Sequence, residues 1–65
     1  MRIDVNGDLR EVTGTTLADA LAELGWGHSK VATALNGAFV PATARTTQTL
    51  RDGDRVEVLA PMQGG

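Results

Sequence analysis

The chain of 65 residues ends in two glycines, Gly64 and Gly65, and the chemistry that it can offer is concentrated there. An end with so few side chains has one reactive handle, a terminal carboxylate. With a pKa of about 3.5 this group is ionised and unreactive toward nucleophiles at neutral pH. An enzyme that uses ATP can activate it as an acyl-adenylate, and backbone without Cβ atoms can thread a narrow channel to reach the nucleotide. The activated carbonyl of Gly65 could then accept sulfur, giving a thiocarboxylate, or an amine, giving an amide, and the residues alone leave both open.

The rest of the sequence offers little for catalysis. It contains one His, one Trp, one Phe, no Tyr and no Cys, which excludes a disulfide framework, a thiolate zinc site and a cysteine nucleophile. His28 has no second His or Cys with which to bind a metal, and we expect it to be a solvated loop residue. Asp52 and Asp54 flank a glycine, but a calcium loop needs several more oxygen ligands, so a turn is predicted there. No cluster of titrating groups suggests an active site. We therefore expect a protein that is not an enzyme and holds no metal or cofactor of its own.

Length and charge narrow the possible partners. The length predicts one domain with a thin core, and a hydrophobic fraction of 42% is enough to build it. The formal net charge of -2 lacks the basic footprint of a nucleic-acid binder. No apolar run approaches the roughly 20 residues of a membrane span, and no signal-peptide core opens the chain. These features predict a soluble, cytoplasmic protein, monomeric on its own, that binds neither nucleic acid nor membrane.

The first third of the chain has the pattern of a hairpin. Residues 2–5 alternate polar and apolar, which is the period of a half-buried strand. Asn6-Gly7 follows, a strong hairpin signal because both residues tolerate positive φ. Residues 8–13 are expected to form the return strand.

A helix is predicted next. Thr16 is a suitable N-cap, and Asp19 three residues later approximates a capping box and places negative charge near the helix start. Gly25 is positioned to end the helix in a left-handed conformation. Four apolar residues follow the spacing i, i+3, i+4 and i+7, which puts them on one face: Leu17, Ala20, Leu21 and Leu24.

The second half of the chain contains three further predicted strands. Residues 31–35 form a small-residue, partly β-branched run that suits a buried strand, and Asn36-Gly37 predicts a turn. Residues 38–40 form a short strand that Pro41 stops. Residues 42–49 are predicted to be a loop with a short helical turn. After a turn at 52–54, the alternation of residues 55–59 predicts a last strand.

The predicted order is β-β-α-β-β-β. A single helix must cover one face of one sheet, since nothing else can bury that face. The first and last strands would then lie side by side in parallel, because the intervening chain supplies the long crossover that parallel neighbours need. We therefore predict an α+β fold of the ubiquitin-like β-grasp kind, with a mixed sheet of four or five strands in residues 1–60 and a flexible tail in residues 61–65. The side chains expected in the core are Ile3, Val5, Leu17, Leu21, Leu24, Val56 and Val58.

Several other side chains have simpler interpretations. Trp26 is expected to cover the core or the helix end, since a buried aromatic contributes a large area. Leu59 points away from Val56 and Val58 by alternation, toward the outer sheet face. It is a candidate for partner docking, although a single exposed Leu is ordinary. The basic residues expected to be solvated are Arg2, Lys30, Arg45, Arg51 and Arg55.

The whole chain resembles the sulfur carrier proteins of thiamine biosynthesis, which supply sulfur for the thiazole ring. The matching stretches are residues 1–6, 15–21, 31–41 and 52–58, and above all the end Ala60-Pro61-Met62-Gln63-Gly64-Gly65. The resemblance implies that Gly65 carries first the adenylate and then the sulfur. It also implies three partners: a ubiquitin-activating-like adenylating enzyme that uses ATP, a cysteine desulfurase or other sulfur donor, and thiazole synthase. Pro61, Met62, Gln63 and Gly64 form the rest of the tail motif.

One departure and several alternatives accompany this resemblance. Family members often carry an aromatic residue a few positions after the Val-Pro step, where this chain has residues 42–45, and this difference concerns loop packing. The small subunit of molybdopterin synthase shares the fold and the Gly-Gly end, but it is usually longer and approaches the glycines through Pro and Ser. A ubiquitin-like modifier that forms isopeptide bonds, or a plain interaction module, would also fit a β-grasp domain.

Overall fold

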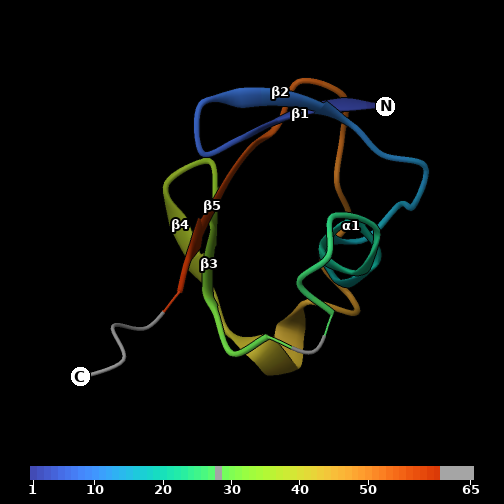
Figure 1. The fold of residues 1–65 in the computed structure, drawn as a ribbon. Helices are drawn as coiled ribbons and strands as arrows, with labels where there is room; N and C mark the ends of the chain where they lie inside the picture. The colour runs from blue at the N-terminus through green and yellow to red at the C-terminus, as the bar shows by residue number, and fades with distance from the viewer. Residues whose placement is uncertain (28, 61–65) are drawn as a thin grey trace.

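The computed structural model describes residues 1–27 and 29–60. These residues form five strands, one α-helix and one short 3-10 helix (Figure 1). Within the described part, no helix has the length and apolar character needed to cross a membrane. In chain order the elements are β1 (Arg2–Val5), β2 (Asp8–Glu11), α1 (Leu17–Glu23), β3 (Ala32–Leu35), β4 (Ala38–Val40), η1 (Ala42–Ala44) and β5 (Arg55–Leu59).

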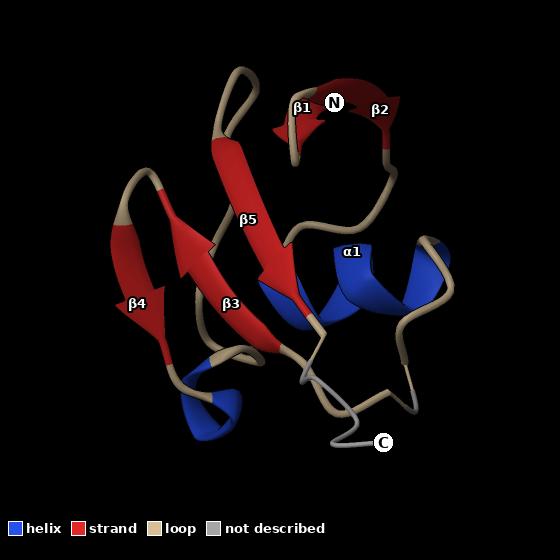
Figure 2. Ribbon diagram, turned by 60° about the vertical axis from the view of Figure 1, so that its left-hand side comes forward, coloured by secondary structure: helices blue, strands red, loops and turns tan. Residues whose placement is uncertain are grey.

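The five strands form one mixed sheet in the order β2-β1-β5-β3-β4. β1 is antiparallel to β2 and parallel to β5, and the register aligns Asp4 with Arg55 and Val5 with Val56. β3 is antiparallel to both β4 and β5. The prediction that the first and last strands lie side by side is confirmed. Figure 2 shows α1 behind the sheet, so that the described helix covers one sheet face and leaves the other uncovered.

Helix α1 starts as the sequence predicts. The N-cap Thr16 has an extended backbone, its hydroxyl accepts a hydrogen bond from the Asp19 N–H at 3.1 Å, and the Asp19 carboxylate accepts one from the Thr16 N–H at 3.4 Å. This reciprocal pair is a complete capping box. The helix ends at Glu23, with Leu24 as C-cap and Gly25 at a φ of 96°.

The core lies between α1 and the inner sheet face. Six of the seven side chains predicted to be in the core are buried, but Leu24 is only half-buried because the helix has ended before it. Trp26 packs against the core, as expected, while His28 lies outside the described residues. The buried hydrophobic side chains are Ile3, Val5, Val12, Leu17, Ala20, Leu21, Val40, Leu50, Val56 and Val58.

Two predicted strands differ from the structure. β2 ends at Glu11 rather than residue 13, since Val12 leaves the strand and turns its side chain into the core. β3 begins at Ala32 rather than residue 31, and it is not a buried strand: only Thr33 is buried. A sheet covered on one face buries alternate residues, whereas a continuous apolar run would require cover on both faces.

The three predicted turns are all present. Asn6 and Asn36 have φ values of 52° and 50°, the left-handed conformation that Asn-Gly hairpins need. At the third turn, Asp52 Oδ1 accepts a hydrogen bond from the Arg2 N–H at 2.7 Å, and Asp54 Oδ2 accepts one from the Arg51 N–H at 2.8 Å. The turn interpretation of the two aspartates is confirmed.

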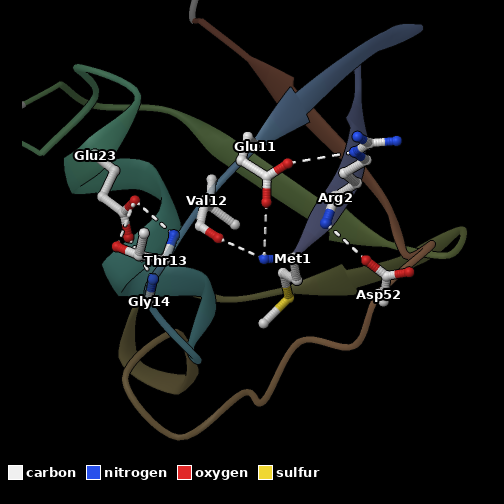
Figure 3. Close-up of polar contacts among 8 residues, drawn as sticks. All are labelled: Met1, Arg2, Glu11, Val12, Thr13, Gly14, Glu23 and Asp52. Carbon is white, nitrogen blue, oxygen red and sulfur yellow. Dashed lines mark hydrogen bonds and ion pairs between the residues drawn. The ribbon is translucent and has the colours of Figure 1, made fainter.

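The loop between β2 and α1 is tied to the helix by Glu23 (Figure 3). Its carboxylate accepts hydrogen bonds from the N–H groups of Thr13 at 2.8 Å and Gly14 at 2.6 Å, and from the Thr13 hydroxyl at 3.1 Å. These donors, first the two backbone N–H groups, lower the pKa of Glu23 below its ordinary value of 4.5. A Cβ at position 14 would overlap the side chain of Asp19, so the loop can approach the helix this closely only with glycine there.

The amino end is held in a similar way. The Met1 ammonium group donates a hydrogen bond to the Val12 carbonyl at 2.8 Å and lies 3.2 Å from Glu11 Oε2, while Arg2 Nε lies 3.3 Å from Glu11 Oε1 (Figure 3). The contact of the Met1 ammonium group with the Glu11 carboxylate is the main cause that lowers the pKa of Glu11. The ion pairs are exposed, so they add little to stability.

Replacing a core side chain tests the helix-on-sheet packing. Leu21→Ala is expected to lower the free energy of unfolding by about 2–5 kcal/mol, because Leu21 is 4% exposed and its removal leaves a cavity. Leu24→Ala, at the half-buried C-cap, should cost less. Chemical denaturation of both variants measures the difference, and equal losses would contradict the packing described here.

The Glu23 carboxylate predicts a dependence of stability on pH. Because folding lowers its pKa, its contribution is present above the unfolded value of about 4.5 and is lost as the pH falls through the lower folded value. Glu23→Gln should therefore lose less stability than the wild type between neutral pH and pH values below 4.5. Glu57→Gln, on the opposite sheet face, is the matched control. Urea denaturation as a function of pH provides the test, and parallel profiles for wild type and Glu23→Gln would contradict it.

Candidate functional site

The described chain ends at Ala60, directly after the central strand β5. The predicted tail residues, from Pro61 to Gly65, lie outside the described residues, and so does the expectation that they form a flexible tail. What the structure does locate is the base of that tail. β5 is hydrogen-bonded to a neighbouring strand on each side, so the tail starts from the middle of the sheet rather than from an edge.

The alternation of β5 sets which side chains flank this base. Val56 and Val58 are 1% and 5% exposed and face the helix, whereas Leu59 is 68% exposed on the outer sheet face. The predicted outward orientation of Leu59 is therefore correct. A large apolar side chain next to the tail and open to solvent is available for contact with another protein.

Leu59 is accompanied by other apolar side chains that the strand register brings to the same face. Ala32 lies opposite Leu59, and Ala34 lies between Glu57 on one side and Phe39 on the other. Phe39 is 70% exposed. A shallow groove runs between these side chains. We call the four apolar residues the outer patch: Ala32, Ala34, Phe39 and Leu59.

Phe39 was not identified from the sequence as a site residue, although the signal was present. Val40 is the inward residue of β4, at 5% exposure, so its neighbour Phe39 must face outward. What the sequence does not reveal is that β4 lies next to β3 and places Phe39 on the same side as Leu59. That depends on long-range strand pairing.

A larger open hollow of about 660 Å³ borders the patch at the tail base. Its lining combines apolar side chains with two basic residues, Lys30 and Arg45. This places positive charge beside the point where the tail leaves the sheet. The lining residues are Ser29, Lys30, Val31, Ala32, Ala42, Arg45, Leu59 and Ala60.

Arg45 corrects a prediction, because it is not simply solvated. Its side chain is half-buried, its Nε donates a hydrogen bond to the buried Thr33 hydroxyl at 3.0 Å, and its Nη2 donates one to the Val31 carbonyl. The Thr33 hydroxyl in turn donates to the Val40 carbonyl at 2.8 Å. Arg45 therefore connects the loop after η1 to the start of β3, and it forms a fixed wall of the hollow.

Leu9 provides a contrast on the same face. It is 67% exposed and lies opposite Asp4, which aligns with Arg55, so all three residues share the outer face with Leu59. Leu9 is on the edge strand β2, however, and the charged residues Asp4 and Arg55 separate it from the outer patch. The apolar surface of the sheet is thus concentrated on the side where the tail begins.

The described residues contain no group of three or more His, Cys, Asp or Glu side chains placed to hold a metal ion. Several acidic side chains make contacts that hold turns and loops together, as for Asp52, Asp54 and Glu23. In this part of the molecule the chemical features that remain are a surface for binding and the start of a tail.

The fold and the site together define a class of protein: β-grasp domains with an apolar patch at the base of the C-terminal segment. Comparisons with known proteins agree. The sequence profile of the ThiS family matches residues 3–65. A protein of Thermus thermophilus named "Sulfur carrier protein ThiS" is 43% identical over 61 residues, which cover 94% of this chain and 95% of that protein.

Solved structures of a thiamine biosynthesis protein from Geobacter metallireducens are also similar. Its crystal structure, titled as ThiS, has a TM-score of 0.83 at 33% identity, with all of both chains covered. Its solution structure has a TM-score of 0.77 at 33% identity, with all of this chain and 88% of that one covered. The chain belongs to the ThiS family. The predicted ubiquitin-like β-grasp fold and the predicted family are both confirmed.

Proposed function

We propose that this chain is a sulfur carrier of thiamine biosynthesis, which donates sulfur for formation of the thiazole ring and is not itself an enzyme. The observation that carries the proposal is the family match, which runs through residue 65 and so includes the Gly-Gly end. The name of the Thermus thermophilus relative, a sulfur carrier, supports the carrier role over the molybdopterin synthase subunit and the protein modifier.

In this function the working group is the terminal carboxylate of Gly65. An adenylating partner joins it to the AMP part of ATP and releases pyrophosphate. Sulfur at the sulfide level, which a thiol reductant releases from the donor's persulfide, then attacks the carbonyl carbon. The bond to AMP breaks, AMP leaves, and a thiocarboxylate remains. The carrier contributes no acid, base or metal to these steps. It contributes a carbonyl that can be delivered into another enzyme's active site.

The tail residues have roles that follow from their types. Gly64 and Gly65 lack Cβ atoms, so their backbone can pass through a narrow channel and approach a nucleotide closely. Pro61 has no N–H with which to extend the β5 ladder, so it separates the tail from the sheet. Met62 and Gln63 connect Pro61 to the two glycines along the chain. Residues 1–60 thus act as the β-grasp domain and residues 61–65 as the reactive tail.

The resemblance to the sulfur carriers of thiamine biosynthesis implies three partners for this chemistry: a ubiquitin-activating-like adenylating enzyme, a cysteine desulfurase or other sulfur donor, and thiazole synthase. The outer patch is the surface that docks on the adenylating enzyme, with Leu59 and Phe39 as its two large side chains. Both are at least 68% exposed, and Leu59 lies two residues before Pro61. Docking beside the tail base orients the tail, which lowers the entropy cost of threading it into the active site.

The docking role can be tested with three matched variants on one sheet face. Leu59→Asp should weaken binding to the adenylating enzyme by about tenfold or more, because it places a charge in a desolvated apolar contact, and Phe39→Asp should act in the same direction. Leu9→Asp makes the same change at an equally exposed position away from the patch and should leave affinity unchanged. Isothermal titration calorimetry measures the three affinities. Equal affinities for Leu59→Asp and the wild type would place the docking surface elsewhere.

The tail chemistry is tested by changing chain length by one residue. Deleting Gly65 withdraws the carboxylate by about 3.5 Å, and appending one residue encloses the needed carbonyl in a peptide bond. Both changes should abolish ATP–pyrophosphate exchange with the adenylating enzyme. The melting temperature should stay near that of the wild type, because the ten side chains that form the buried core of residues 1–60 are unchanged in both variants. Retained exchange in both variants would contradict the carrier mechanism, and a collapsed melting curve would mean that the tail is structural.

A further inference from the structure

The hydrogen bonding of β5 changes where β1 ends. Along the parallel β1–β5 pair, the Asp4 N–H donates to the Asp54 carbonyl at 2.9 Å and the Asn6 N–H donates to the Val56 carbonyl at 3.0 Å. In a continued parallel ladder, the next step would bond the Val58 N–H to the carbonyl of residue 6, and the Val58 carbonyl to the N–H of residue 8. The main chain cannot do this, because it turns away at Asn6 with a φ of 52°.

The carboxamide of Asn6 supplies both missing partners. Its Oδ1 accepts a hydrogen bond from the Val58 N–H at 2.8 Å, and its Nδ2 donates one to the Val58 carbonyl at 3.0 Å. A carboxamide has the same acceptor and donor as a peptide group, so it extends the ladder by one step. The two residues are 52 positions apart in sequence. Replacing the amide by a carboxylate would keep the acceptor but lose the donor.

This contact holds the end of β5 at the place where the tail begins. Val58 faces the core, Leu59 is the next residue and lies on the outer patch, and Ala60 lines the hollow at the tail base. On the β1 side of β5, Asn6 bonds both main-chain groups of Val58, so releasing it would loosen Leu59 and the start of the tail together.

We propose that Asn6 is a positioning residue for the carrier reaction, which fixes the end of β5 so that Leu59 and the tail meet the adenylating enzyme in one arrangement. The proposal rests on the proposed function for its partner, but the structural contact is independent of it. A loose strand end must be ordered when the complex forms, and that cost raises KM for the carrier while leaving the rate of the bound complex nearly unchanged.

The chain contains a matched control for this residue. Asn36 also precedes a glycine in a hairpin turn, has a φ of 50°, and accepts a hydrogen bond from a β5 amide, the Arg55 N–H at 2.9 Å. It acts at the opposite end of β5 from the tail. Its Nδ2 donates to the Asp54 side chain rather than to a main-chain carbonyl.

The test compares Asn6→Asp and Asn6→Gly with Asn36→Gly. Glycine is used at position 36 because Asn36→Asp would set a second carboxylate against that of Asp54. Aspartate tolerates the same backbone conformation, but at position 6 it sets a second acceptor against the Val58 carbonyl. Asn6→Gly keeps the positive φ and removes both bonds without adding charge, so it serves if Asn6→Asp folds poorly. Amide hydrogen exchange of Val58 in the free protein reports the contact, and steady-state ATP–pyrophosphate exchange with the adenylating enzyme reports KM and kcat.

For Asn6→Asp and Asn6→Gly, Val58 exchange should become faster and KM for the carrier should rise, each by about tenfold, with kcat nearly unchanged. Asn36→Gly should match the wild type in both measurements. Unchanged Val58 exchange in the Asn6 variants would overturn the contact itself. Faster Val58 exchange with unchanged KM, or an equal rise in KM for Asn36→Gly, would overturn the positioning role. A wild-type chain that the adenylating enzyme fails to activate would instead overturn the proposed function, while Val58 exchange would still decide the contact.

Discussion

The last strand of this chain lies in the middle of its sheet, and the arrangement of the site depends on that constraint. β5 pairs in parallel with β1, the first strand, and antiparallel with β3. Its inward side chains, Val56 and Val58, are buried with the helix residues in one core. The first and last described strands are therefore paired beside the core of the described structure. Whatever follows residue 60 leaves from a strand that is held on both edges and on one face.

The second determining feature is that the described part of the chain has one helix for a sheet with two faces. That helix buries the inner face, and the outer face stays in contact with solvent (Figure 2). Among the described residues, three large hydrophobic side chains are strongly exposed, and all three lie on this outer face: Leu9, Phe39 and Leu59. Two of them, Phe39 and Leu59, belong to the outer patch. Apolar side chains that gather in one patch, unlike the isolated Leu9, are typical of a surface that contacts another protein.

Much of the fold could be predicted because its signals are local. The capping box at Thr16, the helical spacing of the apolar residues, the Asn-Gly turns and the alternation of β5 each involve residues within a few positions of one another, and each is present as predicted. The adjacency of β1 and β5 could also be predicted from the sequence, because a sheet with a single helix and a long crossover connection has few possible strand orders.

One error is local: Leu24 fits the helical period but lies just beyond the last turn. The other errors arise where a residue's environment is set by distant parts of the chain. The sequence places Arg45 in solvent because its partners, Thr33 and the Val31 carbonyl, are more than ten residues away. Phe39 was missed as a site residue because its relation to Leu59 passes through β3. Asn6 was predicted as a turn residue only, since no local pattern shows that its carboxamide bonds Val58.

Domain and tail thus divide the proposed function between them. In the proposal, the described domain supplies a fixed origin and an apolar surface, and the last residues supply the reactive carbonyl. Fold and family agree with the proposed carrier, since the ThiS match covers residues 3–65. A protein modifier with the same fold would use the same activated carbonyl but pass it to an amine.

The most direct test of the account is the intact mass of the chain after incubation with its adenylating enzyme, ATP, a cysteine desulfurase with cysteine, and a thiol reductant that supplies the two electrons needed to bring persulfide sulfur to the sulfide level. The account predicts a mass increase equal to the replacement of one oxygen by one sulfur, located by fragmentation at Gly65. An unchanged mass alongside active partner enzymes would contradict it, and so would a product in which Gly65 is joined to a lysine of another protein.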